Sequence, residues 1–312
     1  MPLVTVTEAA QLVGVSHSTI RNYIKDKKLS AFMKQNRLLI DRDEMLSVFS
    51  PKRTSPAVRP DSARVIAVAN QKGGVGKTTS AVAIASLLAL HGPTLALDCD
   101  PQGNMTQAFG YDPDSQDRTL YNVLVDELPL ADILLRVEVP GELYLSPSNL
   151  DLADVWRRAA GKVGLEALLK TAIQPLLPRF QYILLDCPPS LDMTTINCLV
   201  AATEVIVPVD MSLFSVRGMV KLQATIGEVR KVNPDLPEPR ILACRTEHTT
   251  VSETIEGGLR DKFGGEIFKA TIPKTKDVPA SQFAKQPLPV HAPRSKATRA
   301  YESVVEEIRR GK

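Results

Sequence analysis

The sequence predicts an α/β protein with two domains: a doubly wound, mainly parallel sheet over residues 63–312 and a small winged helix-turn-helix domain over residues 1–50. The larger prediction depends on short apolar runs that alternate with helical patterns, as in βαβ units. It also depends on acidic residues at the ends of these runs, where the carboxyl edge of a parallel sheet gathers them. The smaller prediction depends on two helical patterns separated by a glycine turn.

Length and composition agree with a globular protein. The 312 residues are 44% hydrophobic and 23% charged, which allows one large domain and one small domain. No apolar run is long enough to span a bilayer, and the first residues lack the basic and apolar regions of a signal peptide. The four cysteines have no CxxC spacing, so we expect reduced thiols in a cytoplasmic protein.

The net charge of +3 is unevenly distributed along the chain. Residues 1–60 hold ten lysines and arginines against five acidic residues, and residues 269–312 hold ten against four. The middle of the chain is therefore acidic. The two basic ends indicate two places where nucleic acid could bind.

The first helical patterns lie between residues 7 and 26. Thr7 would cap a first helix, Gly14 would supply a turn, and Ser16 would cap a second helix. The exposed start of the second helix carries side chains that can reach base edges and phosphates. These are Ser18, Thr19, Arg21 and Asn22.

A hairpin and a linker follow. Residues 29–32 and 37–40 alternate like two strands of a wing with Lys34 at its basic tip, and Asp41 would cap a last helix over residues 42–49. Residues 51–62 hold three prolines and no apolar periodicity, which predicts an exposed linker and places the domain boundary there.

The stretch VTEAAQLVGVSHSTIRNYIKDKKL resembles the MerR/excisionase type of winged helix-turn-helix domain. The resemblance implies that the second helix and the wing bind DNA. An alternative stays open, in which this part is a small helical cap that packs on another protein surface without touching DNA.

A phosphate-binding loop follows the first strand of the larger domain. The apolar run Val65–Ala69 predicts a buried strand, a loop with three glycines comes next, and Lys77 and Thr78 precede an apolar helix over residues 80–90. Such a loop directs backbone N–H groups and the helix dipole at an anion. Lys77 would reach the β- and γ-phosphates, and the Thr78 hydroxyl would bind Mg²⁺.

Carboxylates follow two later strands. The strand at 94–97 ends in Asp98 and Asp100, and the strand at 182–186 ends in Asp186. Both strand ends would lie beside the phosphates in a parallel sheet. Asp186 would hold Mg²⁺ directly or through water, whereas Asp98 could instead cap a helix.

The other elements are expected from apolar runs and helical periodicity. We expect strands at 143–146, 205–209, 241–245 and 268–272, and helices at 120–125, 194–202 and 214–232, with a last helix around 301–308 packed on the body.

Three stretches, KGGVGKTT at 72–79, DCDPQGN at 98–104 and DCPP at 186–189, resemble the deviant Walker A, switch I and switch II motifs of the ParA/MinD class of P-loop ATPases. The resemblance implies ATP and Mg²⁺ as cofactors. The residues that it implies for phosphate binding are Gly73, Gly74, Val75, Gly76, Lys77, Thr78 and Thr79.

The same resemblance implies roles for individual side chains. Lys72 would cross a dimer to the partner's phosphates, Asp100 would position the attacking water, and Asp98 would help to organise Mg²⁺. Pro273 would lie near the adenine.

Non-specific DNA contacts are also implied. In ATP-bound dimers of the family, basic residues near the C-terminus face duplex DNA, and here they are Lys274, Lys276, Arg294 and Lys296. The chain departs from the family at Thr246 and His248, which stand where an aspartate and an arginine are common. This departure puts the DNA contact of that arginine in doubt.

The family implies a DNA-partitioning ATPase of plasmids or chromosomes. ATP would join two subunits into a sandwich dimer that binds DNA non-specifically, and a centromere-binding ParB-like partner would stimulate slow hydrolysis. The winged domain suggests autorepression of the operon, and we expect a cytoplasmic, nucleoid-associated protein. The last helix, which ends in RRGK at 309–312, lacks the apolar free face of a membrane anchor, so we expect no membrane partner.

Two alternatives remain open. One is a transcription regulator in which ATP acts as a ligand switch and no cargo moves. The other is an ATPase that positions a protein cargo.

Overall fold

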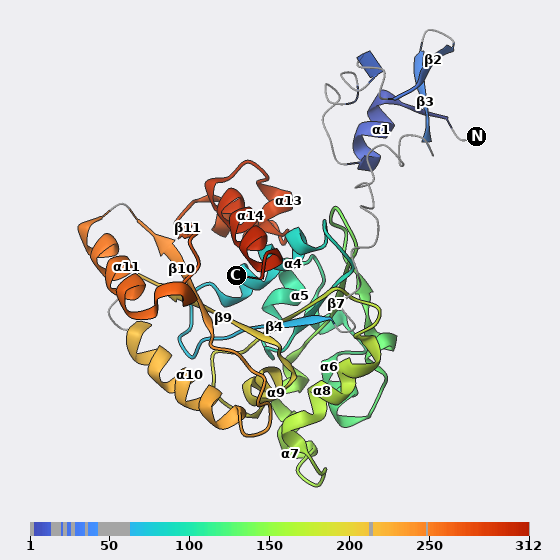
Figure 1. Cartoon of the computed structure of the whole chain (residues 1–312). Helices are drawn as coiled ribbons and strands as arrows, with labels where there is room; N and C mark the ends of the chain where they lie inside the picture. The colour runs from blue at the N-terminus through green and yellow to red at the C-terminus, as the bar shows by residue number, and fades with distance from the viewer. Residues whose placement is uncertain are drawn as a thin grey trace. The chain divides into compact units, whose positions relative to one another are not determined.

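The computed structural model describes residues 3–13, 20, 24–25, 29–34, 37–42, 63–211, 215–247 and 249–311. The chain divides into two compact units, Met1–Arg59 and Pro60–Lys312 (Figure 1). Within the described residues no helix has the length and apolar character needed to cross a membrane.

The N-terminal unit contains a three-stranded antiparallel sheet in the order β1-β3-β2. Its described elements are β1 (Leu3–Thr5), α1 (Val6–Val13), β2 (Ala31–Lys34) and β3 (Arg37–Asp41). The expected hairpin is therefore confirmed with its first strand shifted by two residues, and β1, which the sequence did not predict, pairs with β3. A small core forms from Ala9, Ala10, Ile20, Leu29 and Ile40.

The first helix begins earlier than the sequence predicted. Thr5, and not Thr7, caps α1: the Glu8 N–H donates to Thr5 Oγ1 at 3.3 Å, and the Thr5 N–H donates to Glu8 Oε2 at 2.8 Å. This reciprocal pair of hydrogen bonds satisfies two backbone N–H groups, which explains why the helix starts after Thr5 and not after Thr7. The second predicted helix, with Ser18, Thr19, Arg21 and Asn22, and the predicted helix 42–49 lie largely outside the described residues.

The larger unit is built on an eight-stranded sheet in the order β11-β10-β9-β4-β8-β5-β7-β6. Every neighbouring pair is parallel except β6 with β7. The strands are β4 (Arg64–Val68), β5 (Thr94–Asp98), β6 (Leu135–Arg136), β7 (Leu143–Ser146), β8 (Tyr182–Asp186), β9 (Glu204–Asp210), β10 (Arg240–Thr246) and β11 (Ile272–Pro273).

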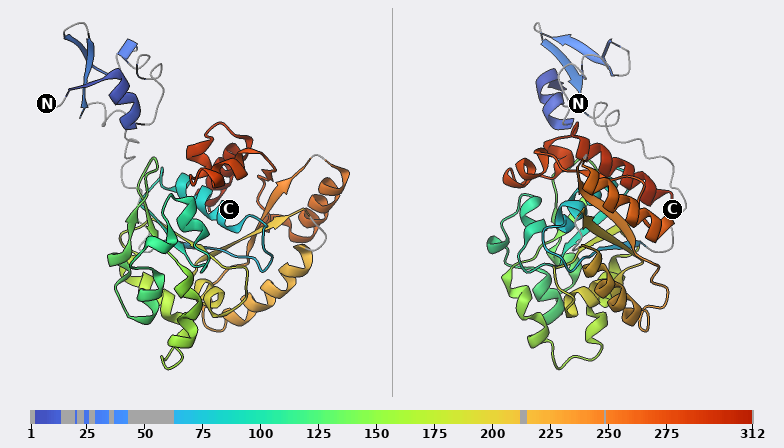
Figure 2. Two further views of the ribbon diagram at one scale, coloured as in Figure 1. Left: turned by 180° about the vertical axis from the view of Figure 1, so that it is seen from behind. Right: turned by 90° about the vertical axis from the view of Figure 1, so that its left-hand side faces the viewer.

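Helices cover both faces of this sheet, so the doubly wound prediction is confirmed (Figures 1 and 2). One face is covered by α4 (Lys77–Leu88), α5 (Asn104–Ala108), α13 (Leu288–His291) and α14 (Lys296–Arg309). The other is covered by α6 (Leu120–Val125), α7 (Val155–Arg158), α8 (Leu168–Ile173), α9 (Met193–Ala201), α10 (Ser215–Val229) and α11 (Thr250–Phe263).

Side chains of the central strand alternate between the two faces. Val65 and Ala67 of β4 belong to one core, whereas Ile66 and Val68 belong to the other. Successive residues of a strand point to opposite sides, so a strand covered on both faces is apolar throughout. The predicted packing of the last helix is also confirmed, because Tyr301, Val304, Val305 and Ile308 are buried.

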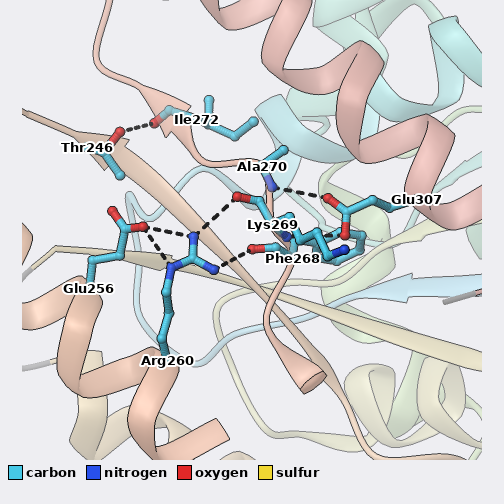
Figure 3. Close-up of polar contacts among 8 residues, drawn as sticks. All are labelled: Thr246, Glu256, Arg260, Phe268, Lys269, Ala270, Ile272 and Glu307. Carbon is cyan, nitrogen blue, oxygen red and sulfur yellow. Dashed lines mark hydrogen bonds and ion pairs between the residues drawn. The ribbon is translucent and has the colours of Figure 1, made fainter. Parts of the chain in front are cut away.

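The predicted strand at 268–272 is wrong for most of its length (Figure 3). The Arg260 guanidinium donates to the carbonyls of Phe268 and Lys269 at 3.4 and 3.2 Å, and the Glu307 carboxylate accepts the N–H groups of Lys269 and Ala270, both at 3.1 Å. Side chains of α11 and α14 thus satisfy backbone groups that a strand neighbour would otherwise bind. The two ends of the segment contact β10: β11 pairs with it, and the Phe268 N–H donates to the Ile241 carbonyl at 2.9 Å.

Candidate functional site

The P-loop, residues 70–78, connects β4 to α4. Gly74 and Gly76 have φ angles of 73° and 95°, which residues with side chains rarely adopt. No atom lies within 4 Å of the position that a Cβ would occupy on either glycine. The loop therefore keeps an open space in front of its backbone, and α4 begins at Lys77 directly behind it.

Two lysines brace the P-loop. The buried Lys77 donates from Nζ to the carbonyl of Lys72 at 3.0 Å. Burial lowers the pKa of Lys77, and Asp186, Cys187 and Asp100 oppose the shift. Lys72 Nζ contacts both carboxylate oxygens of Asp210, at the end of β9, at 2.8 Å.

Two carboxylates meet at the carboxyl edge of the sheet, as predicted. Asp98 and Asp186 lie opposite each other on the paired strands β5 and β8, and both are fully buried. Asp98 accepts hydrogen bonds from Thr106 N and Oγ1, both at 2.8 Å, and from Asp100 N at 3.2 Å. Burial nevertheless raises the pKa of Asp98 to about 7. Asp100 is also buried, and its carboxylate accepts the Gln102 N–H.

Asp186 differs from Asp98 in its hydrogen bonding. Both of its carboxylate oxygens are buried, and neither accepts a hydrogen bond of regular geometry from the described residues; the Thr78 hydroxyl is close enough to favour its charged form. Burial, followed by the negative charge of Asp98, raises the pKa of Asp186 well above its usual value, while Thr78 and Lys77 oppose the rise. An unpaired buried carboxylate is costly, and a hard cation such as Mg²⁺ prefers oxygen ligands of this kind. The residues present therefore fit a magnesium ion.

The remaining candidate residues belong to the last part of the larger unit and to the N-terminal unit. Pro273 is half-buried at the end of β11, and Lys274 beside it pairs with Glu247 at 2.6 Å. Lys276, Arg294 and Lys296 are exposed. The side chain of Lys34 and the whole of His248 lie outside the described part of the chain.

Sequence reasoning missed several residues that contact the P-loop or the first turn of α4. Asp210 stands at the end of a strand, the same signal that identified Asp98 and Asp186. Arg245 also stands at a strand end, and its Nη1 donates to the carbonyl of Gly74 at 3.2 Å. Gln282, whose side chain donates to Thr79 Oγ1 at 3.1 Å, has no sequence signal.

These features define a class of protein. A buried parallel strand, a glycine loop and a helix N-terminus make an anion site, and a neighbouring strand supplies a buried carboxylate for a metal ion. This combination is that of a P-loop nucleotide-binding protein.

Comparison with known proteins identifies the family. A family model described as an AAA domain matches residues 63–237, and one described as a helix-turn-helix domain matches residues 3–50. An uncharacterized protein of Mycobacterium tuberculosis is 36% identical over 266 residues, which are 83% of each chain. The chromosome partitioning protein ParA of Caulobacter vibrioides is 33% identical over 250 residues, which are 78% of this chain and 93% of that protein.

A solved structure agrees. Cobyrinic acid a,c-diamide synthase from Mycobacterium smegmatis, with bound ATP analog and magnesium, superposes with a TM-score of 0.71. The two sequences are 33% identical, and the match covers 80% of this chain and 94% of the synthase chain. The chain belongs to the ParA family of P-loop ATPases, and it carries a helix-turn-helix domain at its N-terminus.

Proposed function

We propose that the chain binds ATP with Mg²⁺ and hydrolyses it to drive DNA partitioning. The observation that carries the nucleotide site is Asp186, a buried carboxylate with unpartnered oxygens at the strand end next to the P-loop. The partitioning role is supported by the ParA relative, of which the chain covers 93%.

The P-loop residues would bind the phosphates. Backbone N–H groups of a glycine loop that opens a helix suit an anion. Lys77, which donates to the Lys72 carbonyl, would exchange this carbonyl for phosphate oxygens. The residues of this proposed phosphate site are Gly73, Gly74, Val75, Gly76, Lys77, Thr78 and Thr79.

The carboxylates would divide the remaining roles. Asp186 and the Thr78 hydroxyl would hold Mg²⁺, which when bound neutralises charge that develops on the phosphates. Asp98, already bonded to Thr106, would fix the loop that carries Asp100, and Asp100 would orient the attacking water. Pro273 would contact the adenine.

Dimerisation would involve Lys72. In the single chain its ammonium group contacts Asp210. To reach the phosphates of a partner subunit, Lys72 would have to leave this carboxylate. The ion pair is thus compatible with a resting state that ATP-dependent pairing of two subunits replaces.

DNA binding would occur in two ways. Lys274, Lys276, Arg294 and Lys296 are exposed on the larger unit and could contact phosphates without reading sequence. The N-terminal domain would read a specific site through Ser18, Thr19, Arg21, Asn22 and Lys34, and so repress its own operon. A centromere-binding ParB-like protein would stimulate hydrolysis and release the DNA, in a cytoplasmic protein that associates with the nucleoid.

The match of residues 3–50 to a helix-turn-helix family model also favours a second function. In this alternative, ATP switches a transcription regulator and no cargo moves. Positioning of a protein cargo is a further alternative.

Retention on non-specific duplex DNA would distinguish these functions. The full chain, residues 63–312, and Lys72→Ala in both would be compared with ATP, ADP and no nucleotide. Partitioning predicts retention of residues 63–312 with ATP only, and its loss in Lys72→Ala. Retention that requires residues 1–50 and ignores nucleotide would contradict partitioning and favour the regulator.

A further inference from the structure

Arg245 occupies an unusual position in the sheet. It lies near the end of β10, where the pairing with β11 shifts register: Cys244 pairs with Ile272, and Thr246 pairs with Pro273. Its φ angle is 56°. Such irregularities redirect a side chain and are common beside active sites.

This backbone conformation disfavours arginine. A left-handed φ brings the Cβ too close to the backbone, so glycine is the usual residue there. A side chain in this conformation persists only when its surroundings compensate for the strain. The position of the guanidinium group is therefore informative.

The guanidinium group contacts the P-loop from the solvent side. Arg245 is exposed, and its Nη1 donates to the carbonyl of Gly74 at 3.2 Å. In a trans peptide the carbonyl and the next N–H point in opposite directions. An arginine that holds the Gly74 carbonyl on the outside consequently directs the Val75 N–H to the opposite side of the peptide.

Packing restrains only one side of this peptide. Val75 is fully buried, whereas a Cβ built on Gly74, as on Gly73 and Gly76, would meet nothing within 4 Å beyond the adjacent residues. Lys77 braces the loop through the Lys72 carbonyl, but this lysine has to turn to the phosphates when nucleotide binds. The Arg245 contact can remain when that happens, because it uses the Gly74 carbonyl and leaves the Val75 N–H available.

We propose that Arg245 is a positioning residue, which holds the Gly74–Val75 peptide of the P-loop in the orientation that receives a nucleotide polyphosphate. This inference rests on the proposed nucleotide binding. Loss of the guanidinium group would remove this restraint on the Gly74 carbonyl, so ATP binding would weaken while chemistry in the bound state would change little.

The test compares Arg245→Gly with the wild-type full chain. Glycine relieves the backbone strain, so the Tm is expected to stay equal or to rise. The Kd for ATP, measured by isothermal titration calorimetry, is expected to increase about threefold to tenfold, as for one lost hydrogen bond. The kcat at saturating ATP is expected to stay within about twofold, so the loss appears in KM.

Lys285→Gly is the matched control. Lys285 is also an exposed cation with a left-handed φ, 51°, but its recorded backbone contact is with Gln282 and not with the P-loop. It should leave the Kd for ATP unchanged. Arg245→Lys keeps the positive charge but lacks the planar guanidinium group with its fixed donors, so its affinity for ATP should lie between those of Arg245→Gly and wild type.

Three outcomes would overturn the inference. An Arg245→Gly variant that binds ATP as tightly as wild type would show that the contact is incidental. Equal loss of affinity in Lys285→Gly would assign the effect to net charge. A wild-type chain that binds no ATP would overturn the proposed function, and this inference with it.

Discussion

Asp98 and Asp186 lie at neighbouring strand ends but differ in their hydrogen bonding. Both are fully buried at paired positions of neighbouring parallel strands, where like charges lie close together and oppose ionisation. Asp98 accepts three hydrogen bonds, whereas Asp186 accepts none of regular geometry from the described residues. The first therefore stabilises a loop, and the second is available to a cation.

Replacing each carboxylate by an amide should change stability in opposite directions. Without Mg²⁺ and nucleotide, Asp186→Asn removes a buried unpaired charge and should stabilise the larger unit by about 1–3 kcal/mol. Asp98→Asn is the matched control. It places an amide N–H₂ against the N–H and hydroxyl donors that Asp98 accepts, so it should destabilise the larger unit by a similar amount. Calorimetric unfolding of the full chain would measure both. Asp186→Asn should also reduce Mg²⁺-dependent hydrolysis by about a hundredfold or more.

The advantage of Asp186→Asn should depend on pH. The pKa of Asp186 is raised in the folded state, so its contribution to stability is present below the unfolded pKa and is lost as the pH rises through the folded value. The difference in Tm between variant and wild type should therefore be larger at about pH 8 than at about pH 5. A constant difference would contradict the unpaired carboxylate.

At the scale of elements, side chains of two helices hold the segment 268–271. Arg260 of α11 binds its carbonyls, and Glu307 of α14 binds its N–H groups and also pairs with Arg240 at 3.2 Å (Figure 3). The segment leads to β11 and Pro273. Its position at the candidate nucleotide site therefore depends on the docking of both helices.

Removing the Glu307 carboxylate should destabilise the larger unit. Glu307→Ala leaves two backbone N–H groups without their acceptor and Arg240 without its partner, so we expect a loss of about 2–4 kcal/mol. Glu307→Gln keeps one acceptor and should lose less. Urea unfolding followed by tryptophan fluorescence measures this, because Trp156, the one tryptophan of the chain, lies in the larger unit.

Glu306→Gln is the control for this prediction. Glu306 lies on the same helix and pairs with exposed Arg309, so its loss should cost at most about 0.5 kcal/mol. Equal effects of Glu306→Gln and Glu307→Ala would mean that the backbone contacts of Glu307 do not hold the segment.

At the scale of the whole molecule, the two ends of the chain are basic and the middle is acidic. Residues 269–312 hold ten basic against four acidic residues, and Lys276, Arg294 and Lys296 are exposed there. Basic side chains bound to DNA phosphates release counterions, so affinity falls steeply with salt.

The triple variant Lys276→Gln, Arg294→Gln and Lys296→Gln should bind non-specific duplex DNA more weakly in the presence of ATP. Its plot of log affinity against log salt should also be less steep, by roughly 0.9 for each lost phosphate contact. Filter binding of the full chain across a salt series would measure the slope. The control is the double variant Arg158→Gln and Lys170→Gln, which removes two exposed cations elsewhere on the larger unit. It should leave the slope unchanged. An equal decrease would mean that the net charge of the protein, and not these three residues, determines the slope.

Most strands and several helices could be predicted because their signals are local. The runs at 143–146 and 182–186 match β7 and β8, and the run at 120–125 matches α6. The helices α5, α7, α8, α12 (Asp277–Phe283) and α13 were not predicted, because segments of four to seven residues carry little periodicity. The longer helix α11 was not predicted either; two consecutive glycines, Gly257 and Gly258, interrupt its helical pattern. The segment 268–272 is not a strand for most of its length although Phe268 and Ile272 are buried, because side chains of α11 and α14 bind the backbone between them.

Sequence was sufficient for the P-loop and the acidic strand ends, because their chemistry lies in contiguous residues and in the common edge of parallel strands. Tertiary structure alone decided which of these groups have partners. Lys72 contacts Asp210 across 138 residues, and Arg245 contacts Gly74 across 171. Strand order, a shift in register and helix docking bring such groups together, and no local pattern encodes these long-range arrangements.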